Sequence, residues 1–171
     1  MRALILVLLG CVSGLGANAA EAKRPLPTDG DAQLAYFLNS EGVYKDYMLQ
    51  CAGCHRFDGK GAENRGIPSF VDSIGLFSRI PDGRAYMIRV PGASQSQLNN
   101  DELAMVLNYV VARFSPDEYD GGKFRLFSAA EVGASRPYKF DDVAEARKAL
   151  EQQMSEQGWE PAPYLFGQAG R

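Results

Sequence analysis

Two cysteines and the only histidine of the chain stand together in the segment Cys51-Ala52-Gly53-Cys54-His55. A thiol can add to a vinyl group, so two thiols separated by two residues can each form a thioether bond to one haem. An imidazole directly after the second cysteine can then reach the iron as an axial ligand. The segment therefore predicts one covalently attached haem c, anchored by Cys51 and Cys54, with His55 bound to the metal.

Other chemistries of paired cysteines need different surroundings. Structural zinc takes four ligands, usually cysteine or histidine, and no cysteine follows Cys54 and no histidine follows His55. A thiol redox motif is expected at the start of a helix that follows a strand, whereas residues 41–50 have a helical pattern. A disulfide between Cys51 and Cys54, or a chance spacing, is the simpler alternative.

The first residues of the chain have the pattern of an export signal. Arg2 precedes a short apolar run over residues 3–9, and small residues follow, with an Ala-x-Ala-like cleavage site at residues 17–19. We expect residues 1–20 to be a signal peptide and the mature protein to be periplasmic. Lipidation at Cys11 is the alternative. Outside the cytosol, paired thiols tend to oxidise unless a reaction such as haem attachment consumes them.

Composition limits the classes of partner. The formal net charge is −3, and the sequence contains no basic cluster and no run of Lys and Arg interleaved with aromatic residues. Nucleic acid is therefore not expected as a partner. No second apolar run is long enough for a membrane helix, so no transmembrane segment is expected after signal cleavage.

Helical periodicity surrounds the cysteine and histidine segment. Residues 31–49 predict one broken helix, interrupted near residues 40–42, that leads into the segment. The clearest helix of the chain follows Asn99, with Glu102 three residues on as in a capping box and an apolar stripe that ends at Phe114. Short helices punctuated by prolines are expected between these two elements.

This arrangement resembles the small class I-like cytochromes c. In that family, a helix with an aromatic residue shortly before Cys-x-x-Cys-His crosses a C-terminal helix that also carries an aromatic, and Tyr47 and Tyr109 match these positions. The family also places a proline soon after the motif, whose carbonyl accepts a hydrogen bond from the haem-ligating histidine, and Pro68 is the candidate. The resemblance spans about residues 31–114. It implies an all-α helical fold wrapped around one haem.

The chain departs from that family on the distal side of the iron. Family members usually place a methionine beside a proline just before the last helix, where this chain has Val90 and Pro91. Met87 is the nearest methionine and is the candidate second axial ligand, and a core methionine is the alternative. Without a methionine ligand, the iron would be five-coordinate or weakly held by water or another side chain.

The run from Gly83 to Gly92 is similar, more loosely, to periplasmic cytochromes that accompany quinoprotein alcohol or amine dehydrogenases. Guanidinium groups match carboxylates in two-point geometry, so Arg84, together with Arg79 and Arg89, is a candidate partner for the haem propionates. Ordinary surface charge is the alternative for each of these arginines.

Residues 21–115 are expected to form the cytochrome c domain, and residues 116–171 a C-terminal extension with one amphipathic helix over residues 141–157. The expected function is a periplasmic electron carrier, not an enzyme. Its donor would be a dehydrogenase, which the looser resemblance makes a quinoprotein, and its acceptor a downstream cytochrome or oxidase. One alternative is a haem protein whose open distal site binds a small ligand or peroxide. Another is an accessory subunit that docks through the extension.

Overall fold

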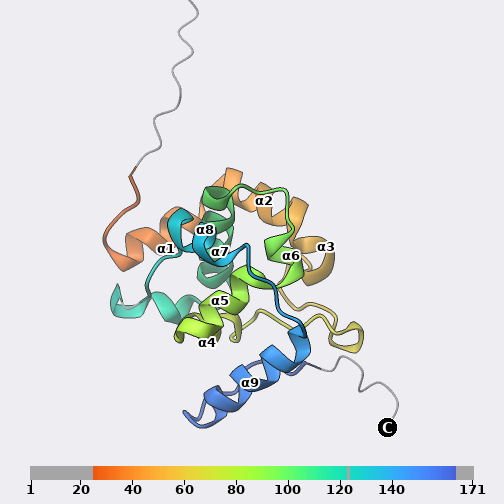
Figure 1. The fold of residues 1–171 in the computed structure, drawn as a ribbon. Coiled ribbons are helices and arrows are strands. Elements are labelled where there is room, and N and C mark those ends of the chain that lie inside the picture. The colour runs from red at the N-terminus through yellow and green to blue at the C-terminus, as the bar shows by residue number, and fades with distance from the viewer. Residues whose placement is uncertain (1–24, 123, 165–171) are drawn as a thin grey trace, which may run out of the picture.

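Every regular element in the described part of the chain is helical (Figure 1). The computed structural model describes residues 25–122 and 124–164, and within these ranges it contains no strand, only an isolated bridge between Ala62 and Ile67. The predicted all-α class is therefore confirmed for these residues, whereas the predicted signal peptide and Cys11 lie outside them. The helices are α1 (Gly30–Leu38), α2 (Glu41–Gln50), α3 (Ala52–His55), η1 (Glu63–Arg65), α4 (Ile74–Ser78), α5 (Pro81–Arg89), α6 (Pro91–Ser94), α7 (Asn100–Phe114), η2 (Pro116–Gly122), α8 (Ala129–Ser135) and α9 (Val143–Ser155).

The helix predicted before the cysteine and histidine segment is present and broken where expected. Helix α1 begins after Asp29, whose carboxylate accepts a hydrogen bond from the Ala32 amide, and it ends at Leu38. Helix α2 restarts at Glu41 and leads directly through Cys51 into α3. The segment therefore lies at the end of a helix.

None of the helices in the described ranges combines the length and apolarity that crossing a bilayer requires.

Helix α7 forms the centre of the fold. Its first turn has the predicted capping box, in which the Asn99 side chain accepts from the Asp101 and Glu102 amides and the Glu102 carboxylate accepts from the Asn99 amide. Helices α1, α2, α4 and α8 all contact α7. The predicted apolar stripe is buried and consists of Leu103, Val106, Leu107, Val110 and Phe114.

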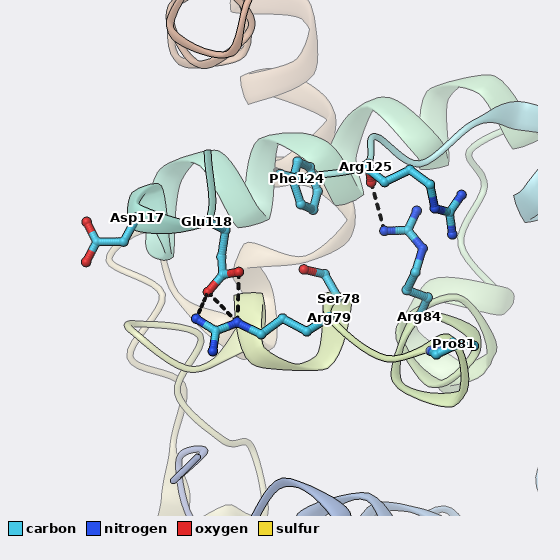
Figure 2. A pocket seen from close by; sticks show the side chains of 8 residues that line it. All are labelled: Ser78, Arg79, Pro81, Arg84, Asp117, Glu118, Phe124 and Arg125. Carbon is cyan, nitrogen blue, oxygen red and sulfur yellow. Dashed lines mark hydrogen bonds and ion pairs between the residues drawn. The ribbon is translucent and has the colours of Figure 1, made fainter. Parts of the chain in front are cut away.

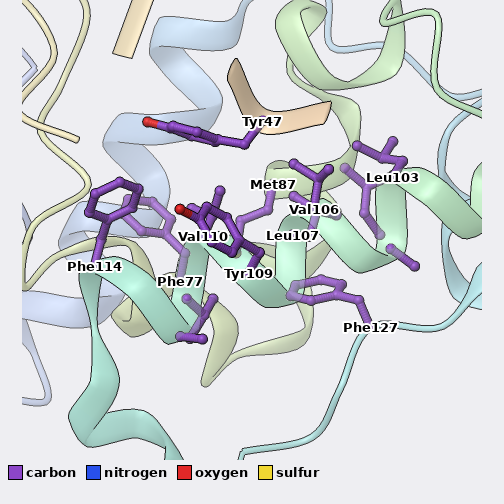
Figure 3. Packing of buried hydrophobic residues seen from close by; sticks show 14 of the residues in the cluster. Tyr47, Phe77, Met87, Leu103, Val106, Leu107, Tyr109, Val110, Phe114 and Phe127 are labelled. Atoms are coloured by element: carbon purple, nitrogen blue, oxygen red, sulfur yellow. The ribbon is translucent and has the colours of Figure 1, made fainter. Parts of the chain in front are cut away.

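Aromatic side chains join α2 to α7 (Figure 3). Tyr47 is 0% exposed, and its ring centroid lies 5.5 Å from that of Tyr109 and 5.7 Å from that of Phe114. Its hydroxyl donates a hydrogen bond of 2.5 Å to the carbonyl of Arg56, the residue directly after His55. The Cys51 amide donates to the Tyr47 backbone carbonyl, so this one residue binds both ends of the cysteine and histidine segment.

Replacing Tyr47 with phenylalanine is expected to lower the free energy of unfolding by about 1–2 kcal/mol, because the Arg56 carbonyl loses a buried donor. Urea denaturation of the full-length protein measures the change. Tyr44→Phe is the matched control: Tyr44 also packs against Tyr109, but it is exposed. Equal losses in the two variants would contradict the role given to the Tyr47 hydroxyl.

The C-terminal extension contains a helix that the sequence did not predict. The helix predicted over residues 141–157 is α9, which contacts α5, but α8 precedes it and packs on α7. Helix α8 begins after Ser128, whose hydroxyl accepts from the Glu131 amide. Only Val132 of α8 is buried, so no apolar stripe marks this helix in the sequence.

A buried amide joins the extension to α7. The Asn108 side chain donates to the Phe127 carbonyl at 3.0 Å and accepts from the Phe127 amide at 2.7 Å. The buried Tyr119 hydroxyl donates to the Asn108 backbone carbonyl at 2.9 Å. Phe127 and Tyr119 both belong to the segment after residue 115. The first part of the extension therefore shares one core with α7.

Arginine side chains hold α8 and the residues on either side of it in place. The guanidinium of Arg84, in α5, donates two hydrogen bonds of 2.7 Å to the Glu131 carboxylate and one of 2.8 Å to the Arg125 carbonyl. Arg136, directly after α8, donates to three backbone carbonyls within residues 94–98. The extension therefore also fixes the loop that leads into α7.

Candidate functional site

The two cysteines lie on a single helical turn at the end of α2. The Cys51 amide donates to the Tyr47 carbonyl at 2.9 Å, and the Cys51 carbonyl accepts from the Cys54 and His55 amides at 3.2 and 3.0 Å. Both thiols are free, with Cys51 partly buried and Cys54 exposed. The two sulfur atoms are not bonded to each other, so both are available to bond to another group.

The surroundings of Cys51 do not suit thiol redox chemistry. Burial, together with the negative charge of Asp46 and the neighbouring Cys54, raises the pKa of the Cys51 thiol to about 11. Redox-active cysteines instead have a lowered pKa, because the thiolate is the reacting form. Within the described ranges, moreover, no three or more His, Cys, Asp or Glu side chains form a metal-binding group.

His55 is held as a neutral imidazole. Its ring stacks on Phe70 with a centroid distance of 3.7 Å, and burial lowers its pKa to about 4. Its Nδ1 atom is buried and makes no hydrogen bond of good geometry among the described residues. Metal ions bind the neutral form of histidine, so this ring fits the predicted role of an axial ligand.

The loop after the motif brings Pro68 back to His55. The Pro68 backbone carbonyl interacts with the imidazole as a hydrogen-bond acceptor, which by itself favours the protonated ring. Gly61 makes this return possible: it has a φ of +62°, its amide donates to the His55 carbonyl, and a Cβ there would lie 2.7 Å from the Pro68 oxygen. The structure thus places the Pro68 carbonyl beside His55, as the resemblance predicted.

Met87 is buried in α5. Figure 3 shows it among side chains of α7, and it belongs to the same apolar cluster as Tyr47 and Tyr109. A buried thioether in this core is compatible with an axial ligand and with a core methionine. The assignment of Met87 to the iron therefore stays a prediction.

The arginines predicted to meet the haem propionates have partners within the chain. Arg84 binds Glu131, Arg79 binds Glu118, and Arg89 donates to the carbonyls of residues 138 and 139. Arg84 therefore already has an anionic partner, which weakens the case for a propionate contact.

Arg79 and Arg84 also line a pocket of about 570 Å³, shown in Figure 2, together with Ser78, Pro81, Asp117, Glu118, Phe124 and Arg125. Its walls come from α4, α5 and the start of the extension rather than from α2 and α3. This pocket is thus distinct from the cysteine and histidine site, and its arginines are paired with acidic side chains.

Two residues that the sequence did not single out complete the surroundings of His55. Phe70 supplies the aromatic surface on which the imidazole stacks, and Arg147 of α9 is close enough to act on it electrostatically. Neither residue lies in a local pattern that points to the motif.

No family model, curated protein or solved structure matches the chain.

Proposed function

We propose that this protein is a c-type cytochrome that carries single electrons. The observation that supports it best is the combination of two free thiols on one helical turn with a buried, neutral imidazole directly after them. A haem bound there would supply reversible one-electron chemistry at its iron. Cys51 and Cys54 would anchor the group covalently, and His55 would hold the iron on one side.

The surrounding residues would keep the centre rigid and dry. Stacking on Phe70 and the Pro68 carbonyl fix the orientation of the His55 ring, as second-shell groups do for metal ligands. The buried Tyr47 holds α2 on α7 next to the anchors. A site that does not rearrange between oxidation states suits electron transfer.

The exposed edge of the site suits brief contacts with partners. Cys54 is exposed, and Phe57, two residues after His55, is 67% exposed. Electron-transfer complexes are typically small and weak, so a limited apolar surface is sufficient. We propose a periplasmic dehydrogenase, in the looser resemblance a quinoprotein, as the electron donor and a downstream cytochrome or oxidase as the acceptor.

The absorption spectrum of the purified full-length protein tests this function. We expect haem that stays on the polypeptide after denaturation, that is reduced and reoxidised reversibly, and that is indifferent to carbon monoxide. The absence of covalent haem would overturn the proposal. Haem that binds carbon monoxide readily would instead support the alternative of an open distal site for a small ligand or peroxide.

Replacing Met87 with alanine is expected to convert low-spin haem into high-spin haem that binds carbon monoxide, because a methyl group cannot replace the thioether ligand. The cavity is also expected to cost about 2–5 kcal/mol of stability. Met154→Ala is the matched control, since Met154 is equally buried but lies in α9. A spectrum that is the same in both variants would show that Met87 is a core residue.

A further inference from the structure

Ring contacts and a hydrogen bond connect His55 to a buried tyrosine of α2. The His55 ring stacks on Phe70 at a centroid distance of 3.7 Å, and the Phe70 ring lies 5.9 Å from that of Phe114. The Phe114 ring lies in turn 5.7 Å from the ring of Tyr47. The Tyr47 hydroxyl also donates to the carbonyl of Arg56, the residue bonded directly to His55. Two routes thus join Tyr47 to the predicted iron ligand.

Two further tyrosines extend this series of rings to the surface. The Tyr109 ring centroid lies 5.5 Å from that of Tyr47 (Figure 3), and the Tyr44 ring centroid lies 6.4 Å from that of Tyr109. Rings at these separations are in contact. Tyr47 and Tyr109 are buried, whereas Tyr44 is 48% exposed. The three tyrosines, here called the tyrosine relay, therefore lead from the surroundings of His55 to water.

The exposed end of the tyrosine relay is the place where an oxidised ring can be stabilised. A phenol that loses an electron becomes a strong acid, so it must also release its proton. The Tyr47 hydroxyl is bonded to a carbonyl, which is not a base, and Tyr109 interacts with the Arg113 guanidinium, which has no acceptor. Water can accept the proton of Tyr44 because that side chain is exposed. An oxidising equivalent on the relay therefore comes to rest on Tyr44.

We propose that the tyrosine relay supplies an electron when the reduced, haem-loaded protein meets hydrogen peroxide, and that Tyr44 is the residue oxidised. This inference rests on the proposed function. Reduction of hydrogen peroxide to two water molecules takes two electrons and two protons, whereas a one-electron carrier gives only one electron. The second electron and one proton come from the Tyr44 phenol, and the remaining proton comes from solvent. The products are two water molecules, the oxidised centre and a tyrosyl radical.

Coupling of the protein through tyrosine tests this role. Two tyrosyl radicals on separate molecules form a dityrosine bond with the loss of two hydrogens, and peptide mass mapping locates that bond. The reduced, haem-loaded, full-length protein is treated with excess hydrogen peroxide, because an iron with both axial positions filled reacts slowly. We expect a dimer joined through Tyr44. Tyr44→Phe is expected to abolish this dimer, whereas Tyr138→Phe is expected to leave it unchanged, although Tyr138 is 66% exposed.

A variant that interrupts the relay separates relayed oxidation from direct attack on the surface. Tyr109→Phe retains Tyr44 but removes the oxidisable ring between Tyr44 and Tyr47, so it is expected to lower the yield of the Tyr44 dimer. An unchanged yield in this variant would overturn the inference. If Tyr109→Phe does not fold, the unsubstituted protein decides, because coupling that favours the more exposed Tyr138 also overturns the inference.

The proposed function and this inference fail in different ways. Haem-loaded protein that forms no tyrosine-linked dimer would overturn the inference and leave the proposed function intact. An unsubstituted protein without covalent haem would overturn the proposed function itself.

Discussion

A variant in which Cys51 and Cys54 are both replaced by alanine is expected to retain no haem on the denatured chain. In the proposed cytochrome each thiol would form one thioether bond, so the double substitution would remove both covalent links. The single variants are expected to keep one link each and to bind haem with an unreacted vinyl group. Intact-mass measurement and the absorbance of the denatured protein give the amount of attached haem.

The same measurement separates haem attachment from the disulfide alternative. A chain with a Cys51–Cys54 disulfide would lack two hydrogens and carry no haem, and the double substitution would not change its absorption spectrum. Far-UV circular dichroism of each variant shows whether the helices have formed. Haem that persists on the double variant would contradict the thioether assignment.

Replacing Glu131 with glutamine is expected to lower the free energy of unfolding by about 3–5 kcal/mol. Arg84 is only 4% exposed, and the substitution leaves its buried guanidinium without an anionic partner. Its remaining hydrogen-bond partners are the neutral backbone carbonyls of Arg125 and Leu126. Urea denaturation of the full-length protein measures the loss.

Glu118→Gln is the matched control for this substitution. It removes the partner of Arg79, whose side chain is 37% exposed and can be solvated by water. Exposed ion pairs contribute about 0–1 kcal/mol, so only a small change is expected. A loss from Glu118→Gln as large as that from Glu131→Gln would contradict the importance given to burial.

The Glu131 pair also predicts a dependence of stability on pH. Burial alone would raise the pKa of Glu131, but hydrogen bonds from Arg84 and Arg125 outweigh it and lower the pKa below its ordinary value of 4.5. The unfolded chain then takes up the proton first, so this contribution is present above pH 4.5 and is lost as the pH falls through the folded-state pKa. The free energy of unfolding of Glu131→Gln is expected to fall less steeply over that pH range than that of the unsubstituted protein. Urea denaturation at a series of pH values from neutral to acid measures both.

Local patterns were sufficient to predict the central helix of the fold, on which the helix before the motif packs. The capping box at Asn99 and the apolar stripe that follows it predicted α7, because both signals lie within one helix. Helix α8 was missed because its burial rests on Val132 alone, although Ser128 and Glu131 have the spacing of a helix start. A short helix held by polar contacts leaves only such a weak signal.

The environment of the site depends on contacts between distant parts of the chain. Arg84 was predicted to meet a propionate, but its anionic partner is Glu131, 47 residues later. The electrostatic effect of Arg147 on His55 arises only because α9 folds back on α5, which no local pattern in the sequence shows. Residue type and spacing predict the anchors and the ligand, whereas the charges around them follow from the tertiary structure.

The hydrogen bond between Ala162 and Ser73 has a consequence for the order in which the protein matures. It joins residues 89 positions apart, so it cannot form until the chain has been synthesised as far as Ala162. Cys51 and Cys54 leave the ribosome about a hundred residues before Ala162. The segment around Ser73 therefore stays without this contact to the extension while the residues between them are synthesised.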